Sequence, residues 1–206
     1  MTTFLLIRHA LHGFVGKGLA GRLPAVHLTD EGRVQARELA ETVLSLPVDA
    51  IYASPLERTM ETAEPIGAAL GLPIRPAPEA LEFDFGDWQG RSFEDLGKEE
   101  RWRRFNVFRS GTRAPGGETM QDVQVRVVAW MLRLREQHPD QCIAIVSHAD
   151  TIRAALLHFL GMPLDHFLRI EIKPASITVL SVDDDQPTLW CFSHSGGLPT
   201  MPHTER

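Results

Sequence analysis

The sequence predicts an α/β sandwich in which a sheet with mostly parallel central strands carries helices on both faces. Three short apolar runs, at residues 4–7, 50–53 and 143–146, have the length and composition of buried strands. Each run is followed by a segment with the capping residues or the apolar periodicity of a helix. Alternation of strands and helices favours parallel strands, because the crossover helices then cover the two faces of the sheet.

The first predicted helix lies between the first two strands. Thr29 or Asp30 can cap its start, and Pro47 stops it. Its apolar side chains recur at helical spacing and share one face: Ala36, Leu39, Ala40, Val43 and Leu44. The pattern predicts a helix that packs one side against the sheet.

The second predicted helix follows the strand at residues 50–53. Ser54 can cap it, and Pro55 suits its first turn, where the missing N–H of proline does no harm. Pro65 is expected to kink this helix and Gly71 to close it.

The second half of the chain predicts two further helices and two strands. Residues 118–137 carry an apolar stripe, and Asp150 can cap a helix that ends at Gly161. Residues 176–182 and 188–193 have strand composition and flank a turn-forming stretch.

A single domain, residues 1–194, is the predicted organisation. The 206 residues contain no internal repeat, low-complexity tract or linker-like stretch, and this length suits one core. Residues 195–206 combine Gly, Pro and polar residues without periodicity, so they are expected to form a loose tail.

Composition limits the partners and the compartment. A formal net charge of -6 and a pI near 5.8 argue against nucleic acid and anionic membranes as partners, so an anionic substrate needs a local basic pocket. The N-terminal segment lacks the features of a signal peptide or membrane span, which favours a cytoplasmic protein. Cys142 and Cys191 lie in apolar segments and are expected to act as small hydrophobic residues.

Polar side chains follow each of the three predicted buried strands. Arg8 and His9 come after the first, Arg58 after the second and His148 after the third. In open α/β sheets, ligands bind outside the carboxyl ends of the strands, so these residues are expected to meet at one edge.

Five short motifs in a fixed order extend this observation to most of the chain. They are Arg-His-Ala at residues 8–10, Ser-Pro-Leu-Glu-Arg at 54–58, Leu-Glu-Phe-Asp-Phe-Gly-Asp-Trp-Gln-Gly at 81–90, Pro-Gly-Gly-Glu at 115–118 and Ser-His-Ala at 147–149. With these motifs the chain resembles the histidine phosphatase superfamily, also called phosphoglycerate mutase-like. The resemblance implies a three-layer α/β/α fold and a phosphohistidine intermediate, with neither a metal nor another cofactor. It also implies a set of roles: nucleophile His9, proton donor Glu82, and phosphate ligands Arg8, Arg58 and His148.

The chemistry of phosphoryl transfer suits these residue types. The moving group is metaphosphate-like, so catalysis consists mainly of positioning and charge stabilisation. Two guanidinium groups helped by a histidine can replace a magnesium ion, because each presents paired donors to phosphate oxygens. A neutral imidazole is a nucleophile near pH 7, and a carboxyl such as Glu82 can protonate the leaving group and then deprotonate water. Asp84 is the alternative carboxyl, although turn hydrogen bonds are the commoner role of such a loop residue.

The sequence departs from the family at several positions. Ala10 and Ala149 stand where glycine is usual, which places a methyl group beside the phosphate and requires negative φ there. Residues 11–22 lack the Glu-Thr pair and the Asn of sugar-phosphate-acting relatives, which leaves the substrate open. The same loop carries three residues that either contact the remote part of a substrate or are solvated charges: His12, Lys17 and Arg22.

Residues 98–113 combine six basic residues with Trp102, Phe105 and Phe108. In an acidic chain, an amphipathic helix that packs its aromatic side chains and exposes its arginines explains this mixture better than nucleic-acid binding. The segment lies where the family builds a substrate-covering lid, so one or two of its arginines could contact a second anionic group.

Two other functions share the predicted pocket. A phosphoglycerate mutase would return the phosphoryl group to the substrate, but residues 93–117 lack the tract with which those mutases hold a bisphosphate cofactor. A non-catalytic phospho-ligand binder would lack His9 or Glu82, and both are present. The other histidines show no metal-ligand spacing, so neither zinc binding nor catalysis is expected of them. The expected partner is a small phosphorylated substrate or inorganic phosphate, and a homodimer is compatible with the sequence.

Overall fold

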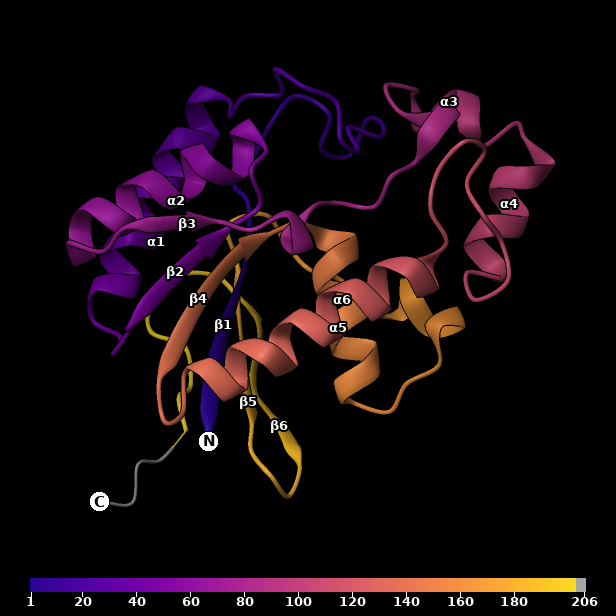
Figure 1. Ribbon diagram of the computed structural model, residues 1–206. Helices are drawn as coiled ribbons and strands as arrows, with labels where there is room; N and C mark the ends of the chain where they lie inside the picture. The colour runs from indigo at the N-terminus through magenta and orange to yellow at the C-terminus, as the bar shows by residue number, and fades with distance from the viewer. Residues whose placement is uncertain (203–206) are drawn as a thin grey trace.

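The computed structural model describes residues 1–202, and a six-stranded sheet runs through its centre (Figure 1). The strands are β1 (Thr2–Arg8), β2 (Ala50–Ala53), β3 (Ile74–Pro76), β4 (Cys142–Ser147), β5 (Ile177–Val182) and β6 (Pro187–His194). Their order in the sheet is β3-β2-β4-β1-β5-β6. Strands β1 to β4 are parallel to one another, whereas β5 and β6 form an antiparallel pair at one edge. The predicted, mostly parallel sheet is confirmed.

Helices cover both faces of the sheet and complete three layers. α1 (Asp30–Leu44) and α2 (Glu57–Leu70) lie on one face, and α5 (Met120–Gln137) and α6 (Ala149–Phe159) lie on the other (Figure 1). The alternation of side chains along β1 serves both cores. Phe4 and Leu6 pack with α5 and α6, whereas Leu5 and Ile7 pack with α1 and α2.

The shorter elements include the amphipathic helix predicted within residues 98–113. They are η1 (Pro78–Ala80), η2 (Gly86–Trp88), α3 (Phe93–Leu96), α4 (Glu100–Val107) and η3 (Leu164–Arg169). In α4, the rings of Trp102 and Phe105 each lie 5.2 Å from that of Trp88, while the basic side chains of this helix are exposed. Arg109 departs from the pattern because it is buried, with its guanidinium over the rings of Phe105 and Phe167.

Several helix ends follow the predicted chemistry. The Thr29 hydroxyl caps α1 by accepting the N–H of Gly32 at 3.0 Å. Gly71 closes α2 with a left-handed φ of 66°, and α2 continues through Pro65. α5 begins two residues later than predicted, because Thr119 and not Glu118 precedes it in a capping box.

Two predicted helix caps are wrong. α2 begins at Glu57, and the hydroxyl of Ser54 instead bonds to His148. α6 begins at Ala149, so Asp150 lies in its first turn and forms ion pairs with two arginines. Local propensity favours both side chains as helix caps, but each one instead bonds to a polar residue near the strand ends.

In the described part of the predicted tail, residues 195–198 are exposed and two later residues contact the protein. Pro199 is buried, and Met201 contacts the core between the sheet and the α1–α2 layer. Residues 203–206 of that prediction lie outside the described residues. Not one of the helices within residues 1–202 combines the length and the apolar character that crossing a bilayer needs.

Candidate active site

The predicted site residues gather at the carboxyl ends of β1, β2 and β4, around a cavity of about 360 Å³. Six of them line its wall: Arg8, His9, His12, Arg58, Glu82 and Ala149. Arg8 and His9 come from the end of β1, whereas Arg58 and Ala149 come from the first turns of α2 and α6. Residues distant in sequence thus meet at one edge of the sheet, as the strand-end argument predicts.

His9 is held as a neutral imidazole with one free ring nitrogen. The side chain is 3% exposed, and Nδ1 lies 2.8 Å from the Ala10 carbonyl oxygen. Because a carbonyl can only accept, Nδ1 carries the proton and Nε2 keeps its lone pair. Burial, followed by the positive charges of Arg58 and Arg8, holds the pKa of His9 well below its usual value of 6.5. The ring is therefore a nucleophile at neutral pH.

The two arginines of the site have buried donors without a hydrogen-bond partner in the described part of the chain. Arg58 is 1% exposed, and its Nη2 donates to the Gly21 carbonyl at 2.6 Å. Its Nε and Nη1 are buried and have no hydrogen-bond partner within residues 1–202. Arg8 donates from Nη1 to the Ile172 carbonyl at 2.5 Å, and its buried Nε has no partner in the same part of the chain. Buried guanidinium donors of this kind favour an anion as their partner.

His148 is fully buried next to His9, with ring centroids 5.2 Å apart. Arg58 Nη2 lies 3.1 Å from His148 Nδ1, and Ser54 Oγ lies 2.8 Å from Nε2. Since a guanidinium can only donate, Nδ1 accepts and Nε2 donates to Ser54. Burial and the neighbouring positive charges lower the pKa of His148 well below its usual value, which keeps the ring neutral. As arranged, His148 orients Arg58.

Glu82 lies in the loop between η1 and η2 and is 8% exposed. Burial, and then the negative charge of Asp150, raises its pKa from 4.5 to about 7. The Phe83 N–H, which donates to Glu82 Oε1 at 2.9 Å, and the two site arginines oppose this rise. Glu82 can therefore give or take a proton near neutral pH.

His12 lies beside the nucleophile. It is 7% exposed, and its ring centroid is 4.8 Å from that of His9. The Phe14 N–H donates to His12 Nδ1 at 3.2 Å, which places the proton of the neutral ring on Nε2. Burial and the two site arginines lower the pKa of His12 to about 4. His12 is thus a neutral hydrogen-bond donor at the cavity.

Three other candidates lie elsewhere. Arg22 is not among the residues that line the cavity, and its guanidinium donates to the Glu82 carbonyl at 2.8 Å and to Glu118. Lys17 also lies outside the cavity wall. Asp84 accepts the N–H of Gly86 at 2.9 Å, the turn hydrogen bond expected of it.

Ala10 and Ala149, which stand where the family usually has glycine, have the negative φ that an alanine requires. Neither Ala10 nor Ala149 has positive φ, so a Cβ is accommodated at both positions. Ala10 is fully buried and its N–H donates to the Thr62 hydroxyl at 3.0 Å.

Three charged residues of the cavity wall are absent from the predicted set: Asp150, Arg153 and Glu171. Arg153 Nη1 donates to Asp150 Oδ1 at 3.2 Å, and Arg109 Nη1 lies 3.5 Å from Asp150 Oδ2. The i,i+3 spacing of Asp150 and Arg153 is a signal that could have identified this pair. Glu171 follows η3 and carries no such signal. Arg109 does not line the cavity, but it pairs with Asp150, which does.

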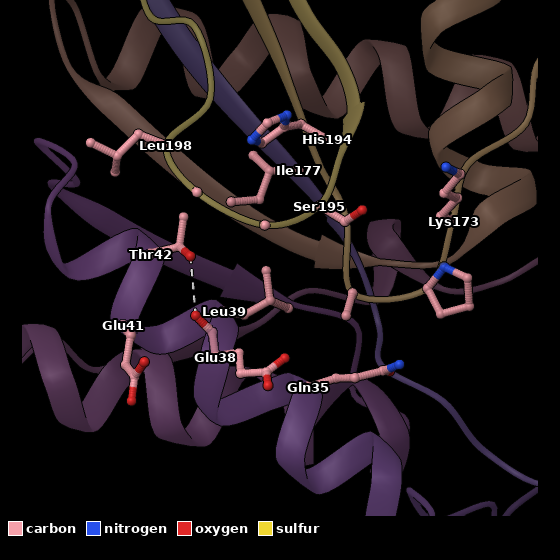
Figure 2. A pocket seen from close by; sticks show the side chains of 14 residues that line it. Gln35, Glu38, Leu39, Glu41, Thr42, Lys173, Ile177, His194, Ser195 and Leu198 are labelled. Carbon is pink, nitrogen blue, oxygen red and sulfur yellow. Dashed lines mark hydrogen bonds between the residues drawn. The ribbon is translucent and has the colours of Figure 1, made fainter.

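A second groove, of about 580 Å³, lies between α1 and residues 194–198 (Figure 2). Its wall carries Glu38 and Glu41 from α1, with Lys173 and His194 on the opposite side. Of the described site residues, none lines this groove, and its two carboxylates would repel a phosphate. The cavity at the strand ends is therefore the candidate active site.

Known proteins resemble the chain over most of its length. The model of the histidine phosphatase superfamily (branch 1) matches residues 4–193. Phosphoserine phosphatase 1 of Hydrogenobacter thermophilus is 30% identical over 186 residues, which cover 89% of this chain and 88% of that protein. "Probable phosphoglycerate mutase GpmB" of Enterobacter sp. (strain 638) is 34% identical over 170 residues, or 81% of this chain and 77% of that one. A structure of phosphoserine phosphatase from Entamoeba histolytica in complex with 3-phosphoglyceric acid aligns with a TM-score of 0.84 at 26% identity, covering 95% of this chain and 98% of that chain.

Proposed function

We propose that this chain, which belongs to branch 1 of the histidine phosphatase superfamily, is a metal-independent phosphomonoesterase that acts through a phosphohistidine on His9. The match to this family and the similarity to known phosphatases identify the chain as a phosphatase. The covalent intermediate, a small phosphorylated metabolite as substrate and residence in the cytoplasm are the parts that we propose.

The arrangement of His9, the two arginines and Glu82 around one cavity supports this proposal. His9 is a neutral imidazole whose Nε2 keeps its lone pair, and it shares a cavity with donors of Arg8 and Arg58 that have no partner within residues 1–202. The pKa of Glu82 in the same cavity is about 7. A nucleophile, an anion clamp and a proton carrier are the three parts that a two-step phosphoryl transfer needs.

In the first step, His9 Nε2 attacks phosphorus while the bond between phosphorus and the ester oxygen breaks. Arg8 and Arg58 hold the phosphoryl oxygens and stabilise their charge, and His148 keeps Arg58 in position. Protonated Glu82 gives its proton to the departing alkoxide, which leaves as an alcohol.

In the second step, water attacks the phosphohistidine and the bond between phosphorus and Nε2 breaks. The Glu82 carboxylate takes a proton from that water, which restores the acid for the next cycle. Inorganic phosphate leaves, and His9 returns to the neutral imidazole. Splitting hydrolysis in this way replaces one difficult step by two easier ones.

The shape and charge of the cavity support a small substrate. Its volume of about 360 Å³ is near the lower end of the range for ligand pockets. His12 and Ala149 line the wall beside His9, so we assign them to contacts with the bound phosphomonoester. The acidic chain has no need of a nucleic-acid partner for this activity.

A mutase is the second candidate, because several relatives are named "Probable phosphoglycerate mutase GpmB". The two activities differ only in the acceptor of the phosphoryl group, which is water in one case and the substrate in the other. The test is a panel of p-nitrophenyl phosphate, O-phosphoserine, sugar phosphates and 3-phosphoglycerate, assayed with and without EDTA. We expect phosphate release that EDTA leaves unchanged. Interconversion of phosphoglycerates faster than phosphate release would favour the mutase, and an activity restored by a divalent cation would contradict metal independence.

A further inference from the structure

We propose that Glu118 is a positioning residue for the general acid: its carboxylate joins Arg22 and Arg126, and through them it holds the loop that carries Glu82. The inference rests on the proposed function, since it assigns Glu118 a part in the proton transfer of that reaction. Glu118 does not line the cavity and touches no reacting atom.

The carboxylate of Glu118 has three donors around it. Its Oε1 accepts from Arg22 Nη2 at 2.8 Å and also from Arg126 Nη1 in a short contact. Its Oε2 accepts the backbone N–H of Asp84 at 3.0 Å. The side chains of Glu118, Arg22 and Arg126 are only 20%, 26% and 21% exposed, so their charges are partly shielded from water.

Both arginines also donate to backbone carbonyls, one of Glu82 itself and two of residues that precede it. Arg22 Nε donates to the carbonyl of Glu82 itself at 2.8 Å. Arg126 Nη2 donates to the Leu81 carbonyl at 2.9 Å, and its Nε donates to the Glu79 carbonyl at 3.3 Å. One carboxylate therefore orients two guanidinium forks, and the forks clamp this short stretch of loop.

The loop needs such support because regular structure is absent from it. η1 ends at Ala80 and η2 begins at Gly86, so no helix or strand covers the residues around Glu82. Two carbonyls at the start of this stretch accept from side chains instead: Ser147 Oγ donates to Ala80 at 2.8 Å and Thr151 Oγ1 donates to Leu81 at 2.7 Å. Side-chain contacts here supply the order that a backbone ladder supplies elsewhere.

The backbone of the Pro-Gly-Gly-Glu motif adds to the same contact. The Glu118 N–H donates to the Asp84 carbonyl at 2.9 Å, and the Asp87 N–H donates to the Pro115 carbonyl at 2.8 Å. Gly86 has a φ of 53°, and a Cβ there would lie 2.1 Å from the Pro115 oxygen. The motif thus packs directly on the loop that carries Glu82, and its last residue, Glu118, connects that loop with Arg22.

The test compares Glu118→Gln with Glu99→Gln as the matched control. Glu99 is also a part-exposed carboxylate that accepts from two side chains, Arg91 Nη1 and Trp88 Nε1, but it lies outside the cavity wall. Glu118→Gln should lower kcat for alkyl phosphates by about 10- to 100-fold, because small displacements of a catalytic group cost rate on that scale. The ratio of the rates with alkyl and aryl phosphates should fall. The inhibition constant of vanadate should stay unchanged, because the phosphate clamp does not depend on Glu118. The control should retain the wild-type kcat and the wild-type rate ratio.

A double variant separates positioning from general damage. In the Glu82→Gln background, the proton carrier is already absent, so Glu118→Gln should cause no further loss of kcat. Arg22→Lys keeps the charge beside Glu118 but loses the Nε contact with the Glu82 carbonyl, and it should reproduce the fall in the alkyl-to-aryl ratio; this variant decides the question if Glu118→Gln does not fold. Wild-type ratios in these variants, or additive losses in the double variant, would overturn the positioning role. If the wild-type protein hydrolyses no phosphomonoester at all, the proposed function fails instead.

Discussion

Replacing Glu82 by Gln should stabilise the protein, and the gain should grow with pH. The glutamine mimics the protonated carboxyl in size but cannot ionise. In the folded protein the pKa of Glu82 is about 7, against 4.5 for the unfolded residue. The folded state therefore binds the proton more tightly, and wild-type stability falls as pH rises from 4.5 through 7.

The size of the effect follows from this interval. At about 1.4 kcal/mol per pH unit, the span from pH 4.5 to 7 corresponds to about 3 kcal/mol of unfolding free energy. Most of this difference develops between about pH 5 and pH 8, because ionisation of the folded carboxyl is nearly complete at the upper limit. For a chain of this size, 3 kcal/mol corresponds to roughly 6–12 °C in Tm.

The assay is urea unfolding of the wild type and Glu82→Gln between pH 5 and pH 8. The buried histidines of the site, His9 and His148, have lowered pKa values and make both proteins less stable toward acid, so the difference between the two curves is the quantity to follow. Glu41→Gln, which removes an exposed carboxylate of α1, controls for the loss of one charge. A difference that stays constant from pH 5 to pH 8 would refute the assignment of a buried, protonated Glu82.

Three further predictions concern the anion clamp and its neighbours. Arg58→Lys should lower kcat/KM by about 100-fold, because an ammonium group cannot reproduce a two-pronged contact; near-normal steady-state kinetics would count against the clamp. His12→Asn should lower kcat/KM by about 10-fold, the worth of one hydrogen bond, whereas His12→Gln keeps a donor near the position of Nε2 and should stay close to wild type. Equal losses in these two variants would mean that His12 contributes bulk and not a donor. Inorganic phosphate and vanadate should inhibit competitively, and noncompetitive inhibition would indicate a different anion site.

The sheet and the centre of the site could be predicted because they rest on short-range patterns. Buried strands are apolar throughout, and parallel strands bring their carboxyl ends to one edge, so Arg8, His9, Arg58 and His148 converge without knowledge of the loops. The position of Glu82 in the site came from the resemblance to a family, because the residues around it have no regular structure.

The partners of individual polar side chains could not be predicted. Ser54 and Asp150 have side chains that often cap helices, yet both bond to residues distant in the sequence or on the next turn. Ser54 bonds to His148, and Asp150 pairs with two arginines. Arg22 lies at the end of a loop from which several residues line the cavity, but its guanidinium contacts Glu118 instead. Such choices depend on which elements pack together, and local sequence does not carry that information.

The role of His9 can be tested directly by trapping the phosphoenzyme. Glu82→Gln should accept a phosphoryl group from an aryl phosphate, whose leaving group needs no proton, but it should lose the base for hydrolysis of the intermediate. Rapid quenching with a radiolabelled aryl phosphate should therefore trap protein-bound phosphate that is labile in acid, as phosphohistidine is, and the label should vanish when His9→Ala is added. Label that resists acid, or that persists without His9, would contradict the central claim that His9 carries the phosphoryl group.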